Sequence, residues 1–138
     1  MSFIKISNNI SELAKIAAFV EDFGNKNSLP MPLVFDINLS IDELVTNIIL
    51  YGYKNNNTRF IDLTMDIVDN VIIIKIIDDA IEFDPTKKAE PKIDTSIDEK
   101  NIGGLGIYFV RKKMDEMNYK RENDQNILIL KKILNKNK

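Results

Sequence analysis

The chain has 138 residues, which is the usual size of one domain and enough to bury a core without disulfides or a structural metal. It contains no cysteine and no histidine, which excludes disulfide bonds, thiolate metal sites and a histidine general base. The formal net charge of -2 is too balanced for a protein that mainly neutralises nucleic-acid phosphates. The start is not signal-like and no apolar run reaches membrane length, so we expect a cytoplasmic protein with no membrane or nucleic-acid partner.

Hydrophobic periodicity predicts one strand, two helices and a hairpin in the first half of the chain. Residues 3–7 alternate apolar and polar side chains as a short strand does, and helical spacing follows up to about Asn27. Apolar residues return at helical spacing between Met31 and about Tyr53, which predicts a second helix. Two β-branched runs, joined by the Asp-Asn pair at 69–70, then predict an antiparallel hairpin whose almost wholly apolar second strand suits a central position.

The second half of the chain contains a long polar segment, a helix and a second hairpin. Residues 79–102 hold two prolines and many charges, and a connection of this length is usually functional or disordered. A helix is predicted after the glycines, with apolar residues up to Met117 on one side, and then a hairpin that turns at 122–125. The order β-α-α-β-β-α-β-β predicts an α/β two-layer sandwich over residues 1–134, followed by a Lys/Asn-rich tail at 135–138.

The first candidate motif is the pair Glu43 and Asn47 in the second predicted helix. Residues four apart project from the same side of a helix, one turn from each other. A carboxylate beside an apolar stripe is costly to desolvate unless a metal, a water or a hydrogen-bond donor pairs with it. The pair therefore suggests a ligand site, and the alternative is a helix whose polar side simply faces water.

The second candidate motif is Asp78-Asp79, where an apolar strand runs directly into the long loop. A carboxylate at a strand end beside such a loop is placed to accept a hydrogen bond from a ligand amine at the edge of a cavity. The alternative is an ordinary turn, since aspartate favours turns.

The third candidate motif is the glycine cluster of residues 101–110, NIGGLGIYFV, which opens a helix. Glycines let the backbone approach a ligand closely, and the free N–H groups and dipole of a helix N-terminus favour a phosphate. No Lys-Ser or Lys-Thr follows the glycines, which excludes a Walker loop, and the preceding segment is a polar loop instead of the strand that a dinucleotide fold requires. The segment is thus predicted to be a phosphate cradle of another kind.

The order and spacing of these motifs resemble those of the GHKL ATPase superfamily, and in particular its small anti-sigma-factor serine/threonine kinases. Residues 42–53, DELVTNIILYGY, resemble the N-box of that family. Residues 78–85, DDAIEFDP, resemble its aspartate box, and residues 103–117, GGLGIYFVRKKMDEM, its second glycine box. The resemblance covers nearly the whole chain and implies a Bergerat-type fold, with a mixed, mostly antiparallel sheet covered on one face by helices.

The resemblance also implies a role for each motif residue. Glu43 would be the general base, Asn47 would bind the Mg²⁺ that bridges the ATP phosphates, and Asp78 would accept a hydrogen bond from the adenine amino group. Residues from about 86 to 102 would form a mobile lid. A carboxylate beside metal-bound phosphates suits phosphoryl transfer. The implied nucleotide-binding residues are Asn47, Asp78, Ala80, Gly103, Gly104, Leu105 and Gly106.

The chain departs from the family pattern at four places, two single residues and two pairs. Ala80 replaces a glycine of the aspartate box, and its methyl group would either narrow the purine pocket or be tolerated. Glu82 replaces a proline of the same box, and Tyr-Gly at 51–52 replaces His-Ala of the N-box. Gln-Asn at 125–126 occupies the place of a Gly-Thr on the last strand, and we assign no adenine contact there.

The resemblance implies a kinase that uses ATP and Mg²⁺ to phosphorylate a Ser or Thr of a STAS-type anti-anti-sigma partner, and so regulates a sigma factor by partner switching. It further implies a homodimer and a partner surface on the first helix and nearby loops. An alternative is a nucleotide-gated module that sequesters a regulator without kinase turnover, which Ala80 favours. A histidine kinase fragment is disfavoured, since the chain has no histidine to phosphorylate. A nucleotide-free interaction domain also stays open.

Overall fold

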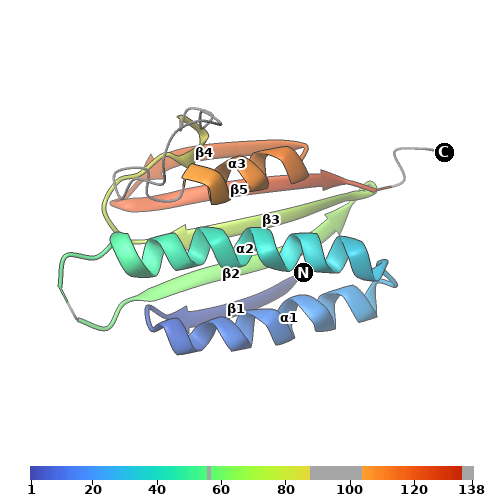
Figure 1. Ribbon diagram of the computed structural model, residues 1–138, viewed down its shortest axis with the longest axis horizontal. Helices are drawn as coiled ribbons and strands as arrows, with labels where there is room; N and C mark the ends of the chain where they lie inside the picture. The colour runs from blue at the N-terminus through green and yellow to red at the C-terminus, as the bar shows by residue number, and fades with distance from the viewer. Residues whose placement is uncertain (56, 88–103, 135–138) are drawn as a thin grey trace.

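The computed structural model describes residues 1–55, 57–87 and 104–134. Within them the chain forms a five-stranded sheet with α-helices on one of its faces, as Figure 1 shows. The predicted element order and the two-layer α/β sandwich are confirmed. No helix of these segments is long and apolar enough to cross a lipid bilayer. In chain order the elements are β1 (Ser2–Ser7), a 3-10 turn (Ile10–Glu12), α1 (Leu13–Lys26), α2 (Met31–Tyr51), β2 (Phe60–Val68), β3 (Val71–Asp78), a second 3-10 turn (Pro85–Lys87), α3 (Gly104–Lys113), β4 (Glu116–Glu122) and β5 (Gln125–Ile133).

The strand order across the sheet is β1-β2-β3-β5-β4, and each pairing between described strands is antiparallel. β3 lies at the centre, as its almost wholly apolar sequence predicts. The resemblance implied a mixed sheet, whereas the described strands contain no parallel pair. The reason is the path after β3: the chain forms α3, reaches the edge of the sheet as β4, and a tight turn then inserts β5 antiparallel to both β4 and β3.

Both hairpin turns consist of two residues with positive φ. Asp69 and Asn70 have φ values of 51° and 64°, and Asn123 and Asp124 have values of 53° and 60°. Two consecutive left-handed residues give the turn that matches the twist of antiparallel strands, and Asn and Asp adopt that conformation more readily than other residues with a side chain. The predicted hairpins are therefore confirmed, and these residue types help to fix their register.

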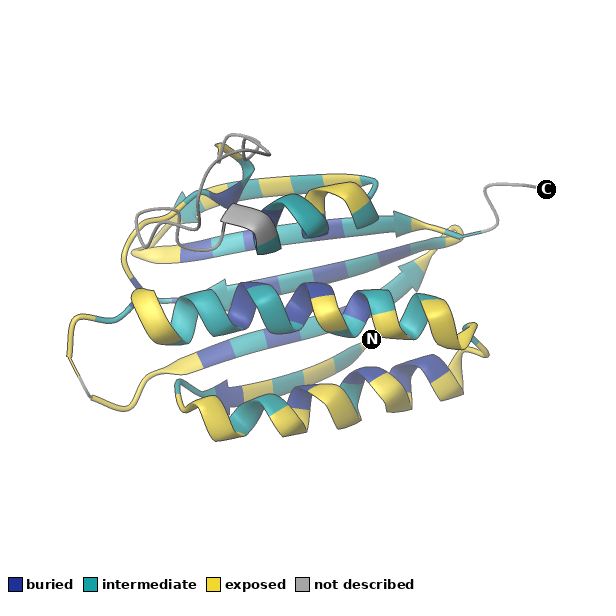
Figure 2. Cartoon of the chain, viewed as in Figure 1, coloured by how far each residue is buried: buried dark blue, intermediate teal, exposed yellow. Residues whose placement is uncertain are grey.

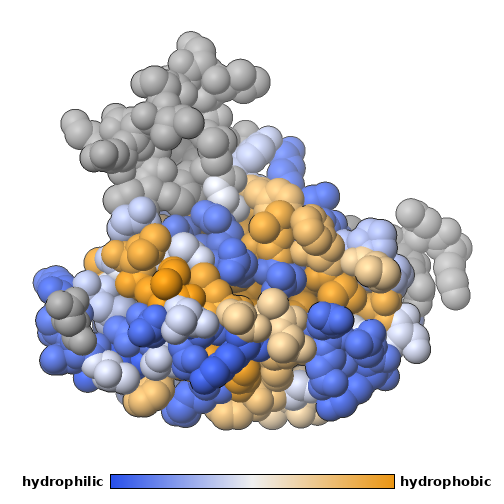
Figure 3. Space-filling view, turned by 60° about the horizontal axis from the view of Figure 1, so that its bottom comes forward, coloured by the Kyte–Doolittle hydropathy of each residue, from blue (hydrophilic) through white to orange (hydrophobic). Residues whose placement is uncertain are grey.

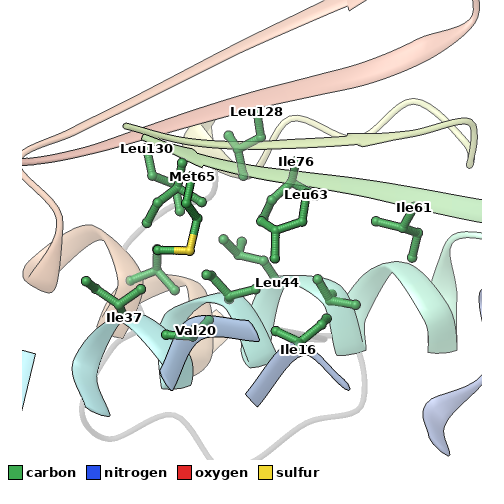
Figure 4. Packing of buried hydrophobic residues seen from close by; sticks show 14 of the residues in the cluster. Ile16, Val20, Ile37, Leu44, Ile61, Leu63, Met65, Ile76, Leu128 and Leu130 are labelled. Carbon is green, nitrogen blue, oxygen red and sulfur yellow. The ribbon is translucent and has the colours of Figure 1, made fainter. Parts of the chain in front are cut away.

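The hydrophobic core lies between the sheet and the helices. Figure 4 shows side chains of α1 and α2 pointing toward those of β2, β3 and β5, and Figure 2 shows burial alternating along the strands. Met117, predicted on the last helix, lies instead on β4 opposite Leu130, because α3 ends at Lys113. The labelled core residues are Ile16, Val20, Ile37, Leu44, Ile61, Leu63, Met65, Ile76, Leu128 and Leu130.

Candidate functional site

The three predicted motifs meet at one end of the molecule. α2 and β3 both end there and α3 begins there, on the left of Figure 1. A cavity of about 240 Å³ lies between these elements and the helix-facing side of β4 and β5. Most of its wall is apolar, which suits the flat faces of an aromatic ligand. The lining residues are Leu44, Asn47, Ile48, Tyr51, Gly52, Ile76, Asp78, Ala80, Ile81, Phe83, Pro85, Ile107, Tyr119, Asn126 and Leu128.

Asp78 is the buried acidic group of this cavity. It is the last residue of β3, its exposed fraction is 4%, and its inward direction follows from the strand alternation. Its Oδ1 atom accepts hydrogen bonds from the backbone N–H of Ala80 at 3.0 Å and from Nδ2 of Asn126 at 2.8 Å. Burial raises the pKa of Asp78, and these two bonds partly oppose that shift. Oδ2 takes part in neither bond, so Asp78 keeps acceptor capacity for a ligand.

Asn126 is a residue of the cavity that our sequence reasoning left out. It lies on β5 directly opposite Asp78 in the β3–β5 register and is 6% exposed. The alternation of side chains along the strand could have identified Asn126, because it lies on the same inward face as the apolar residues Leu128 and Leu130. A polar side chain in such a position must find hydrogen-bond partners, and that requirement marks it as a candidate site residue.

Glu43 and Asn47 lie on the side of α2 that faces the start of α3. A Cβ atom added to Gly106 would overlap the carboxyl group of Glu43, so this carboxylate lies directly against the first turn of α3. The positive end of the helix dipole favours an anionic group at that place. Asn47 lines the cavity, and its buried Nδ2 atom has no hydrogen-bond partner among the described residues. An unpartnered buried amide at a cavity wall is a candidate for contact with a ligand.

Ala80 and Gly52, two departures from the family pattern, lie close together. An added Cβ at Gly52 would lie 2.8 Å from the Cβ of Ala80, closer than two such atoms approach. The same Cβ would lie 2.6 Å from the backbone carbonyl oxygen of Ile48, so the end of α2 itself excludes a side chain at position 52, and the glycine also leaves room for the Ala80 methyl group. The backbone N–H of Ile81 donates to the Gly52 carbonyl at 3.0 Å and ties this turn to the end of α2. The methyl group lines the cavity without closing it.

Some of the predicted residues cannot be placed in this way. Gly104 is the first residue of α3, and α3 begins at the end of the molecule where the cavity lies. Gly103 and the part of the predicted lid from residue 88 to 102 lie outside the described residues, and so does the side chain of Leu105. Of the implied nucleotide-binding set, the structure thus brings together Asn47, Asp78, Ala80 and Gly106, with Glu43 beside them.

The described residues contain no cluster of three or more acidic side chains that could hold a metal ion by itself. Mg²⁺ keeps several waters and often binds through one or two protein oxygens together with substrate phosphates. A single carboxamide is therefore an adequate protein ligand, and a half turn of the Asn47 amide exchanges its oxygen and nitrogen. The unpartnered amide at the cavity wall fits an Mg²⁺-nucleotide better than a free metal ion.

The sequence comparisons agree with this geometry. Residues 6–132 match the family model of the histidine kinase-like ATPase domain. The chain is 29% identical over 98 residues to the serine/threonine-protein kinase BtrW of Bordetella bronchiseptica, covering 71% of this chain and 69% of BtrW. It is 34% identical over 103 residues to the serine-protein kinase RsbW of Staphylococcus aureus, covering 71% of this chain and 65% of RsbW. The chain thus spans about two thirds of the length of these relatives.

Solved structures show the same fold. The histidine kinase domain of the blue-light activated kinase EL346 from Erythrobacter litoralis superposes with a TM-score of 0.55 at 18% identity, covering 91% of this chain and 60% of that chain. A longer structure of the same kinase gives a TM-score of 0.58 at 17% identity, covering 92% of this chain and 42% of that chain. At this identity the likeness concerns the fold alone.

Proposed function

The chain belongs to the histidine kinase-like ATPase domain family, and on that premise we propose that it is an ATP-dependent serine/threonine protein kinase of the anti-sigma-factor type. The observation that carries the proposal is that Asn47 and Asp78 line one cavity while Glu43, one helical turn before Asn47, lies against the first turn of α3. The relatives BtrW and RsbW are both named as protein kinases, which supports the choice of reaction.

In the proposed complex the two ends of the cavity bind different parts of ATP. Asp78 accepts a hydrogen bond from the adenine amino group, and the apolar wall, which includes Ile48 and Leu128, contacts the base. The phosphates lie at the start of α3, where free N–H groups and the helix dipole favour negative charge. Asn47 provides the oxygen for Mg²⁺, which when bound neutralises part of the phosphate charge.

Glu43 is proposed as the general base of phosphoryl transfer. Its carboxylate accepts the proton of the attacking Ser or Thr hydroxyl while that oxygen bonds to the γ-phosphorus and the bond to the ADP oxygen breaks. The first turn of α3, directly beside it, holds the carboxylate close to the place proposed for the phosphates. Orientation of the reacting groups supplies much of the rate enhancement in such transfers.

We propose that the phosphate acceptor is a STAS-type anti-anti-sigma protein and that, when this partner is phosphorylated, the kinase sequesters a sigma factor. The predicted partner surface includes α1 and nearby loops. Beside it, Met31, Phe35 and Leu39 follow each other at four-residue spacing on α2, and all three are exposed. Figure 3 shows hydrophobic patches between hydrophilic ones on the face seen there. Exposed apolar residues at helical spacing favour a protein partner at this place.

The first test is calorimetric titration with ADP and ATP, each with and without Mg²⁺. We expect the parent protein to bind both nucleotides more tightly when Mg²⁺ is present. Asn47→Ala should lose most of that Mg²⁺-dependent gain, because its amide is the proposed metal ligand, and should keep metal-free binding. Asn118→Ala, an exposed asparagine on β4, is the matched control. Failure of the parent to bind at millimolar nucleotide would overturn the proposal and leave an interaction domain.

The proposal includes a homodimer that forms through the uncovered face of the sheet. In the described segments no helix packs on that face, and apolar residues of β3 and β5 lie side by side there, interrupted by Lys75 and Lys131. Lys131 forms an ion pair with Glu116 of β4, and Lys5 forms one with Asp62 between β1 and β2. A self-complementary apolar stripe suits a two-fold interface. The stripe consists of Val71, Ile73, Ile77, Ile127, Ile129 and Ile133.

Sedimentation equilibrium tests this dimer. Ile73→Lys places a charge at the centre of the stripe, and we expect the protein to sediment as a monomer at concentrations where the parent is a dimer, because the buried charge would have no partner. Ala18→Lys, on the exposed side of α1, should remain dimeric. A parent protein that is monomeric at high concentration contradicts the homodimer without affecting the nucleotide site.

A further inference from the structure

Asn126 holds the two groups that border the purine end of the cavity. Its Nδ2 atom donates to Oδ1 of Asp78 at 2.8 Å and to the backbone carbonyl of Ile81 at 2.9 Å. One side chain on β5 thus binds both the carboxylate at the end of β3 and the turn that follows it. The two N–H bonds of the amide are both used in this way.

The oxygen of the same amide is held by donors from β4 and from the turn. Oδ1 of Asn126 accepts from the Tyr119 hydroxyl at 2.6 Å, from Nη1 of Arg121 at 3.2 Å and from the backbone N–H of Phe83 at 3.3 Å. Nη1 of Arg121 also donates to the carbonyl of Ala80 at 2.9 Å. These contacts fix which way the amide points, because its oxygen faces three donors and its nitrogen faces two acceptors.

The amide of Asn126 therefore has no remaining hydrogen-bonding capacity for a base, and it is 6% exposed. It can influence a bound purine only through the groups that it holds. Asp78 is such a group, because Asn126 and the Ala80 N–H both bind Oδ1 and so leave Oδ2 for the ligand.

We propose that Asn126 is a positioning residue that fixes Asp78 as a hydrogen-bond acceptor and thereby sets the selectivity of the cavity for adenine over guanine. The proposal rests on the function proposed above. Adenine carries an amino donor at C6, which a fixed carboxylate oxygen attracts, whereas guanine carries an oxygen there, which the same carboxylate repels. A site with a fixed acceptor rejects a ligand that lacks the matching donor, because the acceptor would stay buried and unpaired.

The charged surroundings of Asp78 give a second measurable consequence. Three titratable or charged groups of the described segments interact with it: Asp79, which is the next residue, Arg121 on β4, and the hydroxyl group of Tyr53, which comes shortly after the end of α2. Burial raises the pKa of Asp78, and the Asn126 amide opposes the shift by donating to the ionised form. Removal of that donor should raise the pKa of Asp78 further. A protonated Asp78 is a poorer acceptor. As the pH falls, a variant without the Asn126 amide should therefore lose ATP binding at a higher pH than the parent does.

The experiment compares Mg-ATP and Mg-GTP binding by calorimetry from neutral to acidic pH. Asn126→Ala should weaken ATP binding by on the order of tenfold, the usual effect of unpaired buried groups. The ratio of ATP to GTP affinity should fall by a similar factor, and the acidic loss of ATP binding should move to higher pH. Asn118→Ala should match the parent, and Asn126→Thr, which restores one hydroxyl donor, should recover part of the ratio. Protonation of the nucleotide itself is the same for every variant, so it cancels when variants are compared at the same pH.

Tyr119→Phe keeps the proposal testable if Asn126→Ala does not fold. It removes only the 2.6 Å bond that orients the amide, and it should lower the ATP to GTP ratio in the same direction by a smaller factor. A folded Asn126 or Tyr119 variant with the parent's ratio and pH midpoint would overturn the positioning role and leave the kinase proposal standing. A parent protein that binds neither nucleotide would overturn both.

Discussion

Replacing Glu43 by Gln is expected to leave Mg-ATP affinity close to that of the parent and to reduce phosphoryl transfer by about 10²–10⁴-fold, the usual contribution of a general base. The amide has nearly the shape of the carboxylate and fits the same contact with Gly106. It cannot accept the hydroxyl proton, so binding and chemistry should separate. Transfer of labelled phosphate from ATP to a purified STAS-domain protein measures the rate, and calorimetry measures the affinity.

Glu122→Gln is the matched control, because Glu122 is an exposed residue of β4 that lies neither in the cavity lining nor on α1. Its transfer rate should equal that of the parent. Equal rates in the Glu43 variant and the parent would exclude Glu43 as the base. A parent protein that binds ATP and transfers no phosphate to any STAS-domain protein would instead favour the nucleotide-gated module without turnover.

Gly106→Ala should weaken nucleotide binding and phosphoryl transfer together, because the new methyl group would overlap the Glu43 carboxyl group. The Glu43 carboxyl group is the far end of a flexible side chain and would move aside. A carboxylate displaced toward the phosphates repels them, so we expect the affinity for Mg-ATP to fall by about tenfold. Alanine is the better helix former, so α3 itself should not be weakened. Calorimetry on the folded variant, checked by circular dichroism, measures the effect.

The double variant Gly106→Ala with Glu43→Ala separates two explanations of that loss. Removing the carboxyl group relieves the overlap, so nucleotide binding should return while phosphoryl transfer stays absent. If binding does not return, the methyl group acts instead by blocking the backbone at the start of α3, and the contact with Glu43 is not the reason for the glycine. Either result identifies why this chain has glycine at position 106.

Much of the fold could be predicted from the sequence because local patterns decide it. Helical spacing of apolar residues predicts α1 and α2, and period-two alternation with Asn and Asp at the turns predicts both hairpins. The path that the chain takes after β3 cannot be predicted from local sequence patterns. Whether β4 or β5 pairs with β3 depends on which strand buries more apolar surface in the centre, and β5, with Leu128 and Leu130 inward, takes that place.

The candidate site divides in the same way. The sequence by itself determined its chemical groups: a carboxylate and an amide one helical turn apart, an aspartate at a strand end, and glycines at a helix start. Only the tertiary structure decided which residues support them. Asn126 reaches Asp78 through strand register, Gly52 makes room for Ala80, and these contacts join residues far apart in the chain. Spacing along a sequence fixes which side chains share one helix or strand, whereas the packing of separate elements fixes which of them touch.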